Sequence, residues 1–107
     1  MDLNIIAQQS HGIAIRRGQQ TDCYSCIKHC AGEIVEVAEA YGWYIELPGD
    51  ENKKELESEV ADVIMCMLTL SAELGFDVEQ ILNDCLEKNR KRVCVTANVK
   101  AEMKAER

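Results

Sequence analysis

The stretch GEIVEVAEAYGW, residues 32–43, carries three glutamates, Glu33, Glu36 and Glu39, in a segment whose apolar residues recur at helical spacing. On a wheel of about 100° per residue the apolar side chains gather on one stripe, and Glu33 and Glu36 lie at its margin. The pattern predicts an amphipathic helix from residue 21 or 22, where a side chain can cap it, to residue 41. This helix therefore holds a pair of carboxylates beside the face with which it must pack.

A second segment repeats the design. Over residues 53–74 the apolar side chains form one stripe, and Glu59 and Asp62 lie at its margin with the same three-residue spacing. Residues 42–52, with two glycines and the only proline, predict a loop that lets the two helices run antiparallel. Packing the two stripes together would bring four carboxylates to one cleft, with Glu55 one turn before Glu59.

Clustered carboxylates repel one another unless a cation neutralises them. Oxygen ligands without paired histidines suit a hard ion, Mg²⁺ or Mn²⁺, which also accepts phosphate oxygens as ligands. A single acidic pair at a helix margin is typical of solvated surface, whereas two pairs in matching register on facing helices favour a metal site. The sequence thus predicts a Mg²⁺ or Mn²⁺ site, and with it phosphate chemistry, at Glu33, Glu36, Glu59 and Asp62.

Two further helices are expected, so the predicted fold is all-α with a four-helix bundle-like core. Residues 2–17 and 77–91 each begin with an aspartate that can cap a helix. Residues 93–107 lose the apolar periodicity, and their VCVT sequence is compatible with a short strand, an extended arm or a frayed helical continuation. We expect one domain over residues 1–107, with its core at about 22–92 and a C-terminal tail or arm.

Length and charge restrict the partners. A chain of 107 residues has a thin core, so its continuous apolar stripes predict self-association through the helix seams. Twelve basic and 19 acidic residues give a net charge of −7, which disfavours nucleic acid polymers and anionic membranes as partners. Neither a transmembrane span nor a signal peptide is evident, so we expect a cytoplasmic protein whose six cysteines are free thiols.

The combined pattern resembles the MazG-like nucleoside triphosphate pyrophosphohydrolases over about residues 22–92. The resemblance lies in Glu33-x-x-Glu36, a loop, Glu59-x-x-Asp62 followed by VIMCMLTLSAELGFD, and the basic EKNRKR at residues 87–92. It implies an all-α, Mg²⁺-dependent homodimer or dimer of dimers. The implied reaction cleaves a nucleoside triphosphate (NTP or dNTP) between its α and β phosphates, giving the monophosphate and pyrophosphate, as in nucleotide pool sanitation.

The resemblance also implies residue roles. Lys88, Asn89 and Arg92 match the basic segment that contacts substrate, although basic residues near a helix end also complement the helix dipole. Lys88 and Arg92 share one helix face, as a phosphate clamp needs. The metal-binding and catalytic positions of the family are matched by Glu33, Glu36, Glu59 and Asp62.

The sequence departs from the family pattern at two places. Ala31 and Gly32 stand where members often have a further glutamate, and the tryptophan pair that many members carry near the start of the second helix is missing. If a base stacks on an aromatic side chain here, the candidates are Tyr24, Trp43 and Tyr44, with Trp43 our choice for substrate binding.

Two other interpretations stay open. Cys23-x-x-Cys26 with His29 and Cys30 could hold Zn²⁺, which would make the protein a zinc-stabilised interaction module. Against it, these cysteines lie on the apolar stripe, where they fit as small hydrophobic residues. The other interpretation is a non-catalytic helical bundle that dimerises through its seams, with the acids as solvated margin.

Overall fold

The computed structural model describes the backbone of residues 1–105 and the side chains of residues 1–92. Within this part the chain forms helices and no strand, which confirms the all-α class. The four helices are α1 Leu3–Arg16, α2 Cys23–Glu46, α3 Asp50–Glu73 and α4 Val78–Ala105.

The N-terminal ends of α1 and α2 lie where the capping residues predict them. The Asp2 carboxylate accepts a hydrogen bond from the backbone N–H of Asn4 at 2.9 Å, and the Asp22 carboxylate accepts one from the N–H of Ser25 at 3.1 Å. These acceptors satisfy N–H groups that the first turn of a helix leaves unpaired. Beyond α1 the chain turns at Gly18, whose φ of 75° is left-handed and favours glycine.

The hairpin of α2 and α3 is longer than predicted. The sequence pattern ended the helix before Gly42, but α2 continues through that residue, and the predicted loop at 42–52 shrinks to residues 47–49. A glycine inside a helix costs only about 1 kcal/mol relative to alanine, which by itself does not end a helix. The side-chain amide of Asn52 donates to the carbonyl of Leu47 at 2.9 Å and so ties the two helix ends together.

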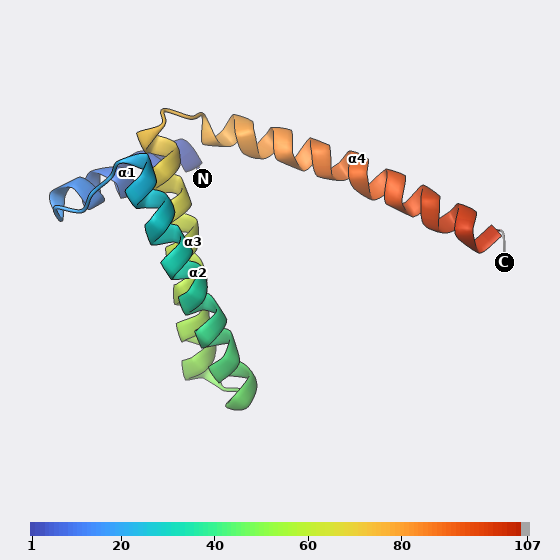
Figure 1. Cartoon of the computed structure of the whole chain (residues 1–107), viewed down its shortest axis with the longest axis horizontal. Coiled ribbons are helices and arrows are strands. Elements are labelled where there is room, and N and C mark those ends of the chain that lie inside the picture. The colour runs from blue at the N-terminus through green and yellow to red at the C-terminus, as the bar shows by residue number, and fades with distance from the viewer. Residues whose placement is uncertain (106–107) are drawn as a thin grey trace.

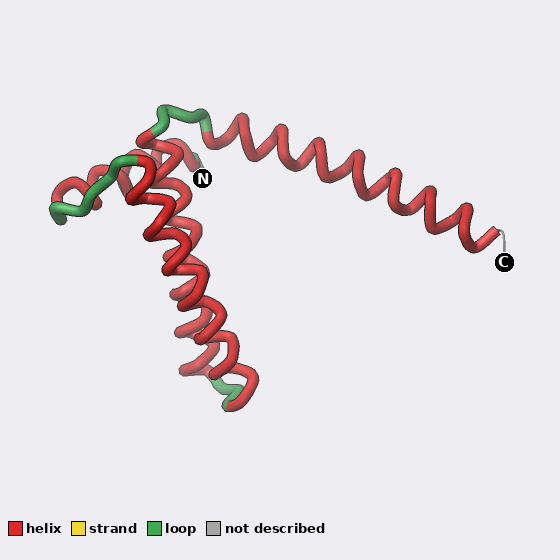
Figure 2. The backbone as a smooth tube through the Cα atoms, viewed as in Figure 1, coloured by secondary structure: helices red, strands yellow, loops and turns green. Residues whose placement is uncertain are grey.

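Helices α2 and α3 run antiparallel, and α1 lies across one end of this hairpin against α3 (Figure 1). Figure 2 shows that the connecting loops are short compared with the helices. The small core lies where α1, α3 and the first residue of α4 meet, and its buried members are Ala7, Leu68 and Val78. This core fixes how α1 crosses the hairpin, and that crossing shapes the cavity described below.

Helix α4 leads away from the other three (Figure 1). Its first turn and that of α1 cap each other: the backbone N–H of Leu3 donates to Glu79 at 2.9 Å, and that of Val78 donates to the side-chain carbonyl of Asn4 at 2.7 Å. Beyond this junction every side chain from 81 to 92 is exposed. The backbone stays helical through the VCVT segment, so a strand there is excluded, while its side chains lie outside the described residues.

One chain exposes more surface than a compact protein of its mass. The radius of gyration is 18.4 Å, against about 13 Å expected for 107 residues. The accessible surface is 8303 Å², against about 6,000 Å² expected. The excess in accessible surface is as large as an extensive subunit interface. It is compatible with a homodimer or homotetramer, which stays a prediction.

Over the described residues, no helix is both long and apolar enough to cross a membrane.

Candidate active site

Three of the four predicted acids meet between α2 and α3. One carboxylate oxygen from each of Glu33, Glu59 and Asp62 lies within 4.8 Å of the others. The antiparallel hairpin explains this convergence, because each acid lies at the margin of the stripe with which its helix packs. We call Glu33, Glu36, Glu59 and Asp62 the acidic cluster.

Two oxygens of the acidic cluster are buried without a hydrogen-bond partner among the described residues, Oε2 of Glu33 and Oε2 of Glu59. Buried polar atoms in proteins are nearly always paired, so each unpaired one calls for a partner such as a water or an ion. A divalent cation at this point would satisfy both oxygens at once.

Glu36, the fourth predicted acid, affects the pKa of Glu59. Burial, together with the neighbouring carboxyl groups of Glu55 and Glu36 and the negative charges of Glu36 and Asp62, raises the pKa of Glu59 from 4.5 to about 7. Without a cation the cluster therefore holds a proton near neutral pH. Glu55, Glu36 and Asp62 thus all act on the carboxyl group of Glu59.

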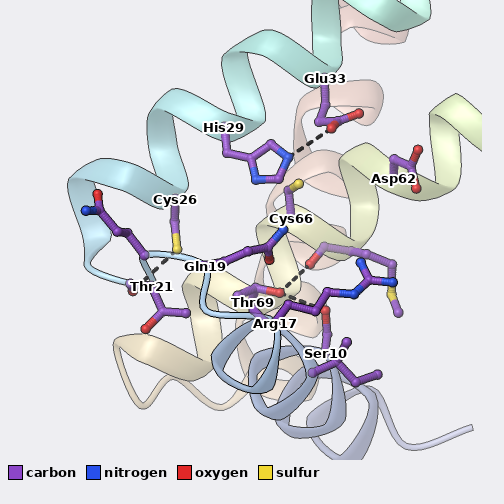
Figure 3. A pocket seen from close by; sticks show the side chains of 14 residues that line it. Ser10, Arg17, Gln19, Thr21, Cys26, His29, Glu33, Asp62, Cys66 and Thr69 are labelled. Atoms are coloured by element: carbon purple, nitrogen blue, oxygen red, sulfur yellow. Dashed lines mark hydrogen bonds and ion pairs between the residues drawn. The ribbon is translucent and has the colours of Figure 1, made fainter.

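A cavity of about 320 Å³ adjoins the acidic cluster, with Glu33 and Asp62 in its wall (Figure 3). Its other walls come from α1, from the turn after α1, from the first half of α2 and from the second half of α3. The lining residues that the sequence analysis did not single out include Ser10, Arg17, Gln19, Gln20, Thr21 and Thr69.

Polar residues on helix faces that pack were the sign of this lining in the sequence. Ser10 and Thr69 stand on helix faces that pack, and their hydroxyls hydrogen-bond each other at 2.7 Å across α1 and α3. Arg17 supplies a cation at the wall and makes no ion pair with any side chain that the structure describes. An acidic end and a polar end thus share one cavity.

The zinc ligands proposed from the sequence do not come together among the described residues. The thiol of Cys26 instead donates to the carbonyl of Thr21 at 3.4 Å. His29 turns toward Glu33, with its Nε2 2.9 Å from Oε1 of that carboxylate. Adjacent positions on a helix point in different directions, which is why the cluster Cys23, Cys26, His29 and Cys30 does not form.

The predicted substrate-binding residues lie away from the acidic cluster of their own chain. Lys88, Asn89 and Arg92 are on the exposed part of α4, which leads away from the hairpin (Figure 1). Trp43, 63% exposed, lies near the loop end of α2, where its carbonyl accepts a hydrogen bond from Asn52. None of the four lines the cavity, so their role in substrate binding stays a prediction.

The fold and the cluster together define a class of all-α protein with an acidic site between two antiparallel helices. The model of the MazG nucleotide pyrophosphohydrolase domain matches residues 22–94, which is more than half of the chain. The chain therefore belongs to the MazG nucleotide pyrophosphohydrolase family, as the resemblance predicts. No curated protein sequence matches it.

Proposed function

We propose that the protein hydrolyses a nucleoside triphosphate, NTP or dNTP, to the nucleoside monophosphate and pyrophosphate, and that it serves nucleotide pool sanitation. The observation that carries this proposal is the pair of buried, unpartnered oxygens of Glu33 and Glu59 in a cluster that opens into a polar cavity. A cation at the cluster would give the two oxygens a partner, and a nucleotide would fill the cavity.

The acidic cluster fits Mg²⁺, or Mn²⁺ in its place, because every donor is a carboxylate oxygen. Glu33, Glu36, Glu59 and Asp62 are the residues that would hold it. Bound there, the ion supplies positive charge against the triphosphate and makes water a better nucleophile. Its binding also displaces the proton that the cluster otherwise retains.

The cavity suits the nucleoside end of the substrate. Its volume of about 320 Å³ lies at the lower end of the range for small-molecule pockets. The amides of Gln19 and Gln20 can donate hydrogen bonds to a sugar or base, and the Ser10 hydroxyl can accept one. Arg17 can donate to a phosphate oxygen from the same wall.

Proton transfer in the reaction falls to the acidic cluster. A carboxylate that is left free of cations can accept the proton of the attacking water, and Glu36 is exposed and close to Glu59. Positive charge stabilises the leaving pyrophosphate, and we propose that Lys88 and Arg92 supply it. Since α4 leads away from its own cluster, these two side chains would serve the site of a partner subunit.

The alternative is a non-catalytic dimerisation module in which the acids are solvated margin. Solvated acids do not explain oxygens that are buried and unpartnered in both Glu33 and Glu59. We therefore favour the enzyme.

A pyrophosphate-release assay tests the proposal. The purified protein is given Mg²⁺ or Mn²⁺ and a panel of canonical and modified NTPs and dNTPs, beside a Glu36→Ala, Asp62→Ala double variant. The matched control is Glu39→Ala, Glu57→Ala, which removes one exposed acid from each of the same helices. We expect release by the wild type and the control and none by the cluster variant, with equal helicity in all three. No release from any nucleotide by the wild type would contradict the proposal.

A further inference from the structure

A second group of ligand atoms shares Glu33 with the acidic cluster. One atom from each of His29, Glu33 and Cys66 lies within 4.8 Å of the other two. His29 and Glu33 are one turn apart on α2, and Cys66 faces them from α3 (Figure 3). His29 is half exposed, so an ion can reach the group from the cavity.

We propose that His29, Glu33 and Cys66 form a second metal site, for Zn²⁺, which shares Glu33 with the acidic cluster. An imidazole nitrogen, a carboxylate oxygen and a thiolate are the three ligand types of protein zinc sites, and three protein ligands with an open fourth position are typical of accessible ones. Mg²⁺ takes oxygen ligands and gains little from nitrogen or sulfur. The two groups of ligands therefore select different metals.

The state of each ligand is compatible with binding. Nε2 of His29 and Oε1 of Glu33 are 2.9 Å apart, and an ion between them would replace that hydrogen bond. Oε2 of Glu33 has no partner among the described residues and stays available. Burial raises the pKa of Cys66 to about 12, so zinc would have to displace the thiol proton, as zinc does when it binds cysteine.

Sharing Glu33 gives the site a consequence for catalysis. Glu33 cannot serve a zinc ion beside His29 and keep the same geometry toward a cation at Glu59 and Asp62. Zinc bound at this site should therefore compete with Mg²⁺ and inhibit the Mg²⁺-dependent hydrolysis, so the Mg²⁺ concentration that gives half-maximal activity should rise with the zinc concentration. This step rests on the proposed function, whereas zinc binding itself does not.

Cobalt provides a direct test of binding without any nucleotide. Co²⁺ takes the place of Zn²⁺ in such sites, and a bond to a thiolate gives a sulfur-to-cobalt charge-transfer absorption. We expect this absorption in the reduced wild-type protein and its loss when Zn²⁺ is added. Zinc affinity follows from competition with a chromophoric chelator.

Variants assign the ligands. Cys66→Ser should remove the absorption, and His29→Gln should weaken zinc binding by about 10- to 100-fold or more. The matched controls keep both properties: Cys85→Ser removes an exposed thiol on α4, and His11→Gln removes the other histidine, which pairs with Glu73. His29 is half exposed, so its variant should fold even if Cys66→Ser does not.

The outcomes separate the two proposals. Absorption that survives in both Cys66→Ser and His29→Gln, or that is lost instead in a Cys23→Ser, Cys26→Ser variant, would overturn the zinc site. An enzyme that is active but shows no such absorption would overturn it as well and leave the proposed function standing. Zinc binding by a protein that hydrolyses no nucleotide would support the site and contradict the function.

Discussion

Glu33 on α2 and Glu59 on α3 share a cluster with Asp62, and each of the two buries one oxygen that has no hydrogen-bond partner among the described residues. Such an arrangement costs free energy in the metal-free chain, because like charges are held close together and away from water. The protein can lower that cost by keeping a proton on Glu59 or by binding a cation. Stability and metal binding are therefore linked at these two residues.

Divalent cations should raise the melting temperature of the protein. A ligand at about 100 times its dissociation constant stabilises the folded state by about 2.7 kcal/mol, which in a domain of this size raises the melting temperature by on the order of 10 °C. Differential scanning fluorimetry with Mg²⁺ or Mn²⁺ against EDTA measures the shift. A Glu33→Ala, Glu59→Ala variant should lose it and Glu39→Ala should keep it; an equal shift in all three would place the cation elsewhere.

The metal-free protein should lose stability as pH rises from about 4.5 to about 7. The pKa of Glu59 is raised in the folded chain from 4.5 to about 7, so between these values the folded state binds more protons than the unfolded state. The free energy of unfolding then falls with rising pH across this window and levels off above it. Urea unfolding in EDTA at a series of pH values measures the slope.

Two controls accompany the pH series. Glu59→Gln removes the titrating group, so the decline in the free energy of unfolding that Glu59 causes should vanish. Near neutral pH the variant should be more stable than the wild type. Saturating Mg²⁺ should also remove the decline, because the ion favours the ionised carboxylate. A wild-type slope equal to that of Glu59→Gln would show that Glu59 keeps an ordinary pKa.

The helices and the meeting of the acids follow from sequence spacing. A common three-residue interval at the margin of two apolar stripes was enough to place Glu33, Glu59 and Asp62 together, since antiparallel packing brings equivalent margins face to face. The end of α2 did not follow, because a single glycine weakens a helix by only about 1 kcal/mol and does not have to end it.

The cavity and the position of α4 could not be read from spacing. The cavity depends on the angle at which α1 crosses the hairpin, which is set by contacts between residues far apart in sequence, such as Ala7 with Leu68. The partnership of His29 with Cys66 is likewise a contact between helices, whereas the sequence pattern grouped His29 with the cysteines nearest to it.

The junction of α1 and α4 should depend on one amide. The side-chain carbonyl of Asn4 accepts from the backbone N–H of Val78 at 2.7 Å, and its amide donates to Asp77 at 2.9 Å. Asn4→Ala leaves the N–H of the buried Val78 without its acceptor, so the free energy of unfolding should fall by about 1–2 kcal/mol. Gln9→Ala, an exposed change on the same helix, should change it by less than about 0.5 kcal/mol. Equal urea midpoints for the two variants would contradict this role.

The exposed part of α4 should hold the subunits together. Its apolar residues Leu82 and Leu86, both exposed in the single chain, lie one turn apart on one face, and contiguous apolar surface of this kind marks an interface. A Leu82→Glu, Leu86→Glu variant should shift the mass measured by light scattering to that of one 12.0 kDa chain. It should also lose pyrophosphate release if Lys88 and Arg92 act on the partner subunit, although its own acidic cluster is unchanged. Lys91→Glu, on the opposite face of α4, should keep the assembly, and a wild-type protein that is active as a monomer would contradict the arrangement.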